Sequence, residues 1–553
     1  MRKQKFVPGS VVTAGSMVPS RMNLSSLEMM FGKETKKVRT DKMRSRMNVQ
    51  RPRTQVQALA EADLRGKTVD GRPASVSNPK MTAFAELVAR VQAEQPDLMK
   101  DVKIIALQHL LGSTGSLLRG FAKLGARPGD VYAMGKRYSQ HDAVMNELSN
   151  DGFHVRAAER ESEVDLEISI DDYGMGRNGG TFGGTAEFGS PRGRNPDRGS
   201  EIERTIDELV AQVGAKRASG SRSKVIVIDD GGDLIERIQN EHPELHDHIV
   251  AVEQTRKGIR KVQQLQLSFP VIDVAQTKAK LTYESPMIGE SIAKSTIARL
   301  ARIEDAGQIV SRRILCISHG AVGAATSAAL RRAGFQVEVY DRSPAARHRA
   351  RKDGFRTYET LDEALSKAQI VVGMTGTALL DKASLAKLPD GAILVNGASS
   401  ATEFVPERND LLRGAVMNSV EVTGDNAKVF AYHRGKRLEL GSVKNDARLA
   451  WSKPSTRLDY LLPLRGVAGD RNKDKQHLLV NQGEVVNFDG SVDPIPPRYI
   501  QLTRGLLLLG AVQAMKTQAP GIHALDEAAQ QRWVGDVETE LRATSESLTQ
   551  PRF

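Results

Sequence analysis

The chain has 553 residues, of which 40% are hydrophobic and 26% are charged. This length allows two or three domains with substantial cores, and the composition is ordinary for a globular protein. No apolar run approaches the ~20 residues that a membrane-spanning helix needs, which excludes a helical membrane protein. Cys316 is the single cysteine, so an internal disulfide is excluded and a cytoplasmic protein is expected.

Residues 1–75 are predicted to form a basic, disordered leader. Lysines and arginines crowd residues 33–53 and contribute to the net charge of +12. A segment of this kind can bind polyanions weakly by releasing counterions. No aromatic residue lies among these charges to stack on bases, so a solvated leader is the favoured interpretation. An interaction protein that uses the leader on nucleic acid is an alternative.

Residues 76–295 alternate strand patterns with helix patterns. Apolar spacing predicts helices over 81–93, 115–124 and 288–303, and strands over 102–107, 131–134, 153–155 and 225–228. This alternation is typical of a doubly wound α/β domain, here of the substrate-binding type. The Gly-rich segment 172–200 interrupts the alternation and is predicted to be a flexible insert, because it cannot build a core.

Residues 296–490 are predicted to form a second doubly wound domain of the Rossmann type. An apolar strand over 314–317 leads into the turn SHGAVG, and a small-residue helix ends at Gly334. Gly320 would let the backbone approach a pyrophosphate, and Gly323 would let helix and strand pack closely. A second strand delivers Asp341, which would accept hydrogen bonds from both ribose hydroxyls and repel a 2′-phosphate. The pattern therefore favours NAD over NADP.

The turn itself departs from the usual glycine pattern. Ser318 stands at its first position, and the Cβ of this serine implies a turn without a strongly positive φ there. The side chain of His319 is expected to point outward. A βαβ unit that only packs is the alternative, but the order of strand, turn, helix and acid favours nucleotide binding. Residues 491–553 are expected to provide a helix over 498–515 that returns to the first domain, then a frayed tail.

Several short segments follow one another in a specific order. They read IDDGGDL at 228–234, VEQTRKGI at 252–259, FPVIDV followed by TKAK at 269–280, and the glycine turn at 318–323. In this order they resemble motifs of the adenosylhomocysteinase family, the NAD-dependent S-adenosylhomocysteine hydrolases. The resemblance covers about 104–515. It implies NAD and a small nucleoside-like ligand between two domains, a homo-oligomer and a role in one-carbon metabolism.

The resembled family uses a redox-assisted elimination, in which oxidation at the ribose 3′ carbon acidifies the 4′ proton and homocysteine leaves. Carried over by position, the resemblance implies that Asp230 and His109 face the substrate. Lys278 is the preferred base for the 3′-hydroxyl, although the spacing leaves Lys280 open. Asp230 could instead cap the following helix, and His109 could be structural.

The cofactor set combines the turn with positions that the resemblance implies: Gly320, Val322, Gly323, Asp341, Thr255, Thr375, Gly376 and Asn487. Thr375 could instead cap a helix, and Asn487 could stabilise a turn. Arg256 and Lys257 replace two threonines of the family and could either pair with a phosphate or be plain surface charge. No metal site is predicted, because the histidines within 242–248 favour surface placement.

Several acid/base groups of the resembled family are missing. Gln254 replaces a glutamate, residues 281–284 offer no Asp-Asn pair, and two histidines are replaced, within 396–399 and at Asp493. We therefore expect an adenosylhomocysteinase-like protein without ordinary hydrolase activity. The alternative is an active hydrolase whose acid/base groups come from elsewhere, such as Tyr283, Glu284 or Asp493. A hydroxyacid dehydrogenase is disfavoured because no suitable Arg, Glu and His series surrounds the NAD unit.

Overall fold

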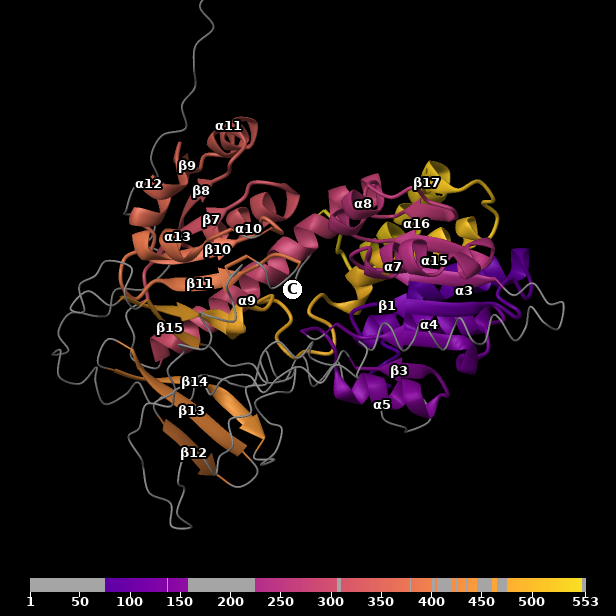
Figure 1. The fold of residues 1–553 in the computed structure, drawn as a ribbon, viewed down its shortest axis with the longest axis horizontal. Coiled ribbons are helices and arrows are strands. Elements are labelled where there is room, and N and C mark those ends of the chain that lie inside the picture. The colour runs from indigo at the N-terminus through magenta and orange to yellow at the C-terminus, as the bar shows by residue number, and fades with distance from the viewer. Residues whose placement is uncertain are drawn as a thin grey trace, which may run out of the picture. The chain divides into compact units, whose positions relative to one another are not determined.

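The computed structural model describes residues 75–136, 138–157, 224–305, 310–377, 379–399, 403–404 and 475–549, together with four strands between 419 and 464. Figure 1 shows how the helices and strands are arranged. Residues 1–74 of the expected leader and the Gly-rich segment 172–200 lie outside the described residues. Among the described residues, no helix combines the length and the apolar character needed to cross a bilayer.

The first sheet has seven parallel strands in the order β3-β2-β1-β4-β5-β6-β17. Apolar side chains fill both faces of its central strands, as expected for a parallel sheet covered by helices. The strand order changes direction between β1 and β4, and such switch points are where doubly wound folds bind ligands. The bounds are β1 Lys103–Leu107, β2 Val131–Met134, β3 His154–Arg156, β4 Val225–Asp229, β5 Ile249–Glu253, β6 Pro270–Asp273 and β17 Gly521–Ala524.

Seven α-helices belong with this sheet in the described part of the chain: α3 Thr82–Glu94, α4 Gly112–Lys123, α5 Asp142–Asn150, α7 Asp233–Glu241, α8 Arg256–Val262, α15 Pro497–Ala514 and α16 Glu527–Arg542. The C-terminal helices share one apolar core with the first strands, and Figure 1 shows them beside that sheet. Trp533 of α16 packs so closely on Gly505 of α15 that a Cβ there would lie 2.1 Å from its ring.

The end of the chain is more ordered than the sequence suggests. Strand β17 joins the edge of the first sheet beside β6, a pairing that the sequence did not predict. The tail expected to fray also packs back, at least through Thr549. Leu548 is fully buried, and its N–H donates to Glu538 Oε1 at 2.9 Å. Burial of this leucine is the physical reason that the expectation of a frayed end is wrong.

The second sheet follows the order β15-β16-β11-β10-β7-β8-β9, and only the edge strand β15 is antiparallel. Its order changes direction between β7 and β10. The α/β class with two doubly wound sheets, the second of Rossmann type, is therefore confirmed. The strands are β7 Arg313–Ile317, β8 Gln336–Tyr340, β9 Arg356–Thr357, β10 Ile370–Gly373, β11 Ile393–Asn396, β15 Tyr460–Leu464 and β16 Lys475–Leu479, and the helices are α9 Ser285–Asp305, α10 Ala321–Arg332, α11 Pro344–Lys352, α12 Leu361–Ser366 and α13 Lys382–Lys387.

Two features lie outside this doubly wound pattern. A three-stranded antiparallel sheet of β12 Ser419–Thr423, β13 Asn426–His433 and β14 Lys436–Lys444 is inserted between β11 and β15. A π-helical turn, Lys280–Glu284, immediately precedes α9. Ile288 of α9 packs against the cores of both sheets. Helix α9 therefore links the two sheets beside the edges where their strands end.

Candidate functional site

A cavity of about 340 Å³ is lined by segments that follow strands of both sheets. His109, Asp230 and Thr255 come from the first sheet, and Thr375 and Ser399 follow strands of the second. The Tyr138 hydroxyl donates to the Ser399 carbonyl at 2.8 Å and so connects the two sides. Carboxyl-end loops of parallel sheets are the usual ligand sites of this fold, and the volume is in the usual range for a ligand pocket.

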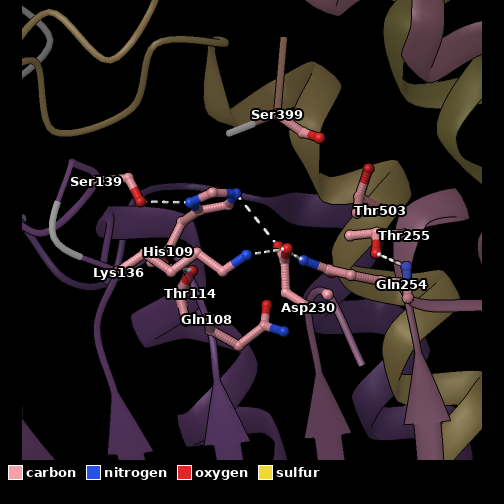
Figure 2. Close-up of polar contacts among 12 residues, drawn as sticks. Gln108, His109, Thr114, Lys136, Ser139, Asp230, Gln254, Thr255, Ser399 and Thr503 are labelled. Carbon is pink, nitrogen blue, oxygen red and sulfur yellow. Dashed lines mark hydrogen bonds and ion pairs between the residues drawn. The ribbon is translucent and has the colours of Figure 1, made fainter. Parts of the chain in front are cut away.

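Four strands of the first sheet each place one side chain in a network around Asp230, which Figure 2 shows. Asp230 follows β4. Lys136, beyond β2, donates to Oδ1, and Gln254, beyond β5, donates to Oδ2. Nε2 of His109, beyond β1, lies 3.2 Å from Oδ2. Burial by itself would raise the pKa of Asp230, but the Lys136 ammonium and His109 hold this pKa well below its usual value. The aspartate is therefore ionised at neutral pH.

His109 is engaged at both ring nitrogens. Burial lowers its pKa although Asp230 opposes this shift, so the ring is neutral at neutral pH. When Nε2 donates to Asp230, Nδ1 is left to accept from the Ser139 hydroxyl, with which it is hydrogen-bonded. The ring also packs on Phe488 with centroids 4.6 Å apart. His109 lines the pocket, but these contacts fit a residue that positions Asp230 better than a free base.

Helix capping does not explain Asp230. Gly232 is the N-cap of α7, and no side chain makes a cap hydrogen bond there. The neighbouring Asp229 instead accepts from the Ile235 N–H at 2.9 Å, and burial raises its pKa to about 7. The structure therefore separates the two aspartates: Asp229 supports the start of α7 from within, and Asp230 faces the pocket.

The lysine of the site is Lys280, which corrects the sequence-based preference for Lys278. The Lys278 side chain is 82% exposed, lies outside the pocket and pairs with Glu527 at 2.5 Å. The Lys280 side chain is 10% exposed, lines the pocket and lies 3.1 Å from Glu284. Both members of this pair belong to the π-helical turn, whose spacing differs from that of an α-helix. Sequence spacing alone could not show which lysine turns inward.

A carboxylate therefore does stand beside the lysine, although the sequence suggested no counterpart of the Asp-Asn pair. Glu284 lines the pocket and accepts from the Thr503 hydroxyl at 2.8 Å. The Lys280 ammonium also donates to the Gln254 carbonyl. Tyr283, another suggested acid/base group, is not among the residues that line the cavity. The Lys280–Glu284 pair is therefore held by hydrogen bonds to Gln254 and Thr503, and both of its members line the cavity.

Asp493 and Arg504 form a second polar group in the pocket wall. Asp493 accepts from the Ser113 hydroxyl at 2.7 Å, and burial raises the pKa of this aspartate to about 6. Arg504, which is 4% exposed, donates to the same hydroxyl at 3.1 Å. Arg504 and Lys136 were not predicted as site residues from the sequence. A single charge within the leucine-rich stretch 502–512 was the available signal for the arginine. A polar residue just beyond a strand was the signal for the lysine.

The glycine turn of the second sheet has the close approach that the sequence predicts. Gly320 is the N-cap of α10. At Gly323, a Cβ would lie 2.2 Å from the Ser318 carbonyl oxygen, so no side chain fits. The expectation for Ser318 was wrong, because its φ is +98°. Its N–H donates to the Tyr340 carbonyl at 2.8 Å, and this contact holds the serine in a conformation that glycine adopts more easily.

Asp341 lies at the end of β8, where the sequence placed it. Its Oδ2 accepts from the His319 N–H at 2.7 Å and its Oδ1 from the Ser343 N–H at 2.8 Å. Each carboxylate oxygen keeps a further lone pair for a ribose hydroxyl. The His319 side chain does not point outward as expected. It is buried against Phe355, and its Nε2 lies 2.9 Å from Asp353 Oδ2.

The remaining predicted cofactor residues divide into two sets. Those that line the cavity are Val322, Thr255, Thr375, Gly376 and Asn487, whereas Gly320, Gly323 and Asp341 do not. Helix capping does not explain Thr375, because Asp381 caps α13 and the Thr375 hydroxyl donates to Glu403 at 2.9 Å. Thr255, in contrast, caps α8 by accepting from the Gly258 N–H at 2.9 Å.

Asn487 lines the cavity near the second sheet. It is 5% exposed, and its buried Oδ1 accepts no hydrogen bond from any residue that the structure describes. A buried carbonyl oxygen without a donor is unfavourable, so a donor on a ligand would satisfy it. The close turn at Gly323 and this free acceptor at the pocket wall both fit a dinucleotide. Within the described ranges, no group of three or more His, Cys, Asp or Glu side chains could hold a metal ion.

Residues 294–403 match the family model of the D-isomer specific 2-hydroxyacid dehydrogenase NAD-binding domain. An uncharacterized protein of Mycobacterium tuberculosis is 26% identical over 408 residues, which is 72% of each chain. S-inosyl-L-homocysteine hydrolase of Methanothermobacter thermautotrophicus is 27% identical over 41% of this chain and 55% of that protein. Adenosylhomocysteinase of Aeropyrum pernix is 29% identical over 33% of this chain and 44% of that protein.

The family match is confined to the second sheet and its helices, so it does not concern the first sheet. The two homocysteine hydrolases are distant relatives that the alignments cover only in part. The predicted cofactor and the predicted resemblance nevertheless agree with these findings. Residues 294–403 are an NAD-binding domain, in a chain that is distantly similar to the adenosylhomocysteinases.

Proposed function

We propose that this chain is an NAD-dependent enzyme that oxidises a hydroxyl of a nucleoside-like ligand in the pocket. The observation that carries the proposal is the Lys280–Glu284 pair, which faces a cavity shared with the NAD-binding domain. A lysine next to a carboxylate, both largely shielded from water, is suited to removing a proton from an alcohol. Bound NAD would supply the hydride acceptor that this oxidation needs.

The proton path follows from the contacts of Lys280. Its ammonium first passes a proton to the Glu284 carboxylate, 3.1 Å away. The neutral amine then accepts the proton of the ligand hydroxyl. The Gln254 carbonyl and the Thr503 hydroxyl hold the lysine and the glutamate in place. Asp230 stays ionised, because three donors surround it, and offers a fixed negative charge to the ligand.

The same geometry speaks against ordinary hydrolase turnover. The Gln254 amide cannot act as a base, and it donates to Asp230. His109 has both ring nitrogens engaged. An elimination followed by addition of water needs further acid/base groups near the leaving group, and each missing group reduces the rate by roughly 10²- to 10⁴-fold. The names of the two hydrolase relatives support a nucleoside thioether or a close analogue as the class of ligand.

The test uses purified protein loaded with NAD and mixed in turn with adenosine, inosine and S-adenosylhomocysteine. Absorbance of reduced nicotinamide reports oxidation of the ligand, and a thiol reagent reports release of homocysteine. We expect reduction of the cofactor with at least one ligand and no thiol release above background. Thiol release at ordinary enzyme rates, about 1–10³ per second, would contradict the proposed loss of hydrolase activity.

An active hydrolase with rearranged groups is the second candidate. It is favoured by Asp493, which lines the pocket with a pKa raised to about 6 by burial and could donate a proton to a leaving group. If this candidate holds, S-adenosylhomocysteine releases thiol and Asp493→Asn abolishes the release. If the first candidate holds, Asp493→Asn leaves cofactor reduction within a few fold of the original.

A further inference from the structure

Helix α8 forms a basic wall of the pocket. Arg256, Lys257 and Arg260 all line the cavity with exposed side chains. In the part of the chain that the structure describes, none of the three makes an ion pair with a carboxylate. Arg260 Nε donates to the Arg256 carbonyl at 3.2 Å, a contact within the helix itself. The sequence left open whether these cations meet a phosphate or are plain surface charge.

The other charged groups of the pocket balance one another. Each carboxylate lies beside a cation: Asp230 with Lys136, Glu284 with Lys280, and Asp493 with Arg504 through the Ser113 hydroxyl. Among the described residues that line the pocket, the charge excess therefore comes from α8. Arg256 and Arg260 are also four residues apart on one helix, a spacing at which like charges repel each other. An anion between the helix and the opposite wall would remove this repulsion.

We propose that Arg256, Lys257 and Arg260 bind a phosphate group of the molecule held in the pocket. The inference rests on the proposed function, because it assumes a nucleotide in this cavity. Arginine forks match phosphate oxygens in pairs, and a lysine adds a mobile point charge. Val322 at the start of α10 also lines the cavity. The phosphate belongs either to the dinucleotide or to a phosphorylated second ligand, and the two sources are distinguishable.

The experiment measures binding by calorimetry with three probes: NAD, adenosine 5′-monophosphate and adenosine. The double variant Arg256→Ala/Lys257→Ala removes two wall cations, whose side chains are exposed, so the fold should be unaffected. The control is Lys516→Ala/Arg532→Ala, which removes two exposed cations outside the cavity and changes the net charge equally. Thermal unfolding of both variants checks their folding, and titrations at low and high salt report the charge dependence.

We expect the wall variant to lose about 10-fold or more in affinity for a phosphate-bearing probe, with the loss shrinking at high salt. Adenosine should be unaffected, and the control should match the original protein. A loss confined to NAD assigns the wall to the dinucleotide, and a loss confined to the monophosphate assigns it to the second ligand. If the wall variant binds NAD as tightly as the original protein does, and the same holds for the monophosphate, the inference is overturned but the proposed function stands. An original protein that binds none of the probes would overturn the proposed function, and the inference with it.

Discussion

The carboxyl ends of the two sheets are built from different kinds of interaction. In the second sheet, the nucleotide turn depends on backbone geometry: a close approach at Gly323, a positive φ at Ser318 and N–H groups around Asp341. In the first sheet, the corresponding edge depends on side chains, and Asp230 is held by groups from three other strands. A backbone device recognises what all dinucleotides share, whereas a side-chain network can be specific for one ligand.

This difference explains why the two edges tolerate change differently. A turn of small residues is damaged by an added atom where backbone segments approach closely, as at Gly323, but it carries little charge. A buried charged network accepts changes of shape but not the loss of a partner, because one unpaired charge remains in a region of low dielectric constant.

The largest expected effect concerns the proposed base. Lys280→Met should lower the rate of cofactor reduction by about 10²- to 10⁴-fold, because Lys280 is the amine paired with Glu284 in the described part of the chain. Lys278→Met should leave this rate unchanged, because the Lys278 side chain is outside the pocket. Stopped-flow absorbance of reduced nicotinamide measures both. The reverse result, a defect in the Lys278 variant only, would restore the sequence-based preference.

The second effect tests the charged network of the first edge. Lys136→Met removes a partner of buried Asp230 and should destabilise the fold by about 3–5 kcal/mol. Lys387→Met breaks an exposed pair between α13 and Asp362 of α12 and should cost less than about 1 kcal/mol. Urea unfolding gives both values. Equal losses in the two variants would show that the Asp230 network does not depend on its lysine.

The pH dependence of stability compares buried carboxyl groups at both edges. Burial raises the pKa of Asp229 to about 7 in the first edge and that of Glu403 to about 7 near the second. Such groups stabilise the folded state in their protonated form, fully below the pKa of the unfolded chain, and this contribution is lost as pH rises through the folded value.

The free energy of unfolding should therefore fall between pH 5 and pH 8, by roughly 2–3 kcal/mol for Glu403. Asp230 does not oppose this trend, because its lowered pKa affects stability only in acid. The lowered pKa of His109 does oppose it, whereas Asp493, whose pKa burial raises to about 6, reinforces it. Glu403→Gln should flatten the profile without changing its direction. A stability that rises over this range would show that these carboxyl groups are ionised in the folded protein.

A smaller effect tests the backbone device of the second edge. Gly323→Ala places a Cβ 2.2 Å from the Ser318 oxygen and should destabilise the fold by about 1–2 kcal/mol while weakening NAD binding. Gly320→Ala is the control for stability, because the nearest atom to its Cβ would be 3.7 Å away. Denaturant midpoints and NAD titrations measure the pair. Similar stability in both variants would mean that the turn can relax.

The smallest expected effect is a gain in the stability of the fold. Ser318→Gly should stabilise the fold by up to about 1 kcal/mol, since glycine removes the strain of a φ of +98° but adds flexibility to the unfolded chain. The midpoint of denaturant unfolding reports the change. A clear loss of stability would mean that the Ser318 side chain contributes more than its long contact with the Gly320 N–H suggests.

The contrast between a local turn and a network of distant segments also determines how much of each sheet edge could be predicted from the sequence. The nucleotide turn is local, so its strand, glycines and Asp341 were readable in order, and only the φ of Ser318 and the buried His319 were misjudged. The first edge is assembled from distant segments. Asp230 and His109 could be named from motifs, but Lys136 and Arg504 could not be joined to them before the topology was known.

A local irregularity of the backbone explains why the sequence favoured Lys278 over Lys280. The π-helical turn at 280–284 changes the direction of successive side chains, and no spacing rule predicted that Lys280 turns inward while Lys278 pairs with Glu527. The strand pairing of β17 was also invisible, because a four-residue edge strand carries little pattern of its own. The fold class, in contrast, followed from repeated alternation over many elements, which one irregular turn does not disturb.

The central claim is that the pocket between the two sheet edges holds NAD beside Lys280. Calorimetric titration of NAD into the purified protein tests it most directly, with native mass spectrometry to detect cofactor that is already bound. We predict either saturable heat or a cofactor that travels with the protein, and weaker binding in the Gly323→Ala variant. No heat with oxidised or reduced nicotinamide dinucleotide, from protein that carries none, would contradict the account.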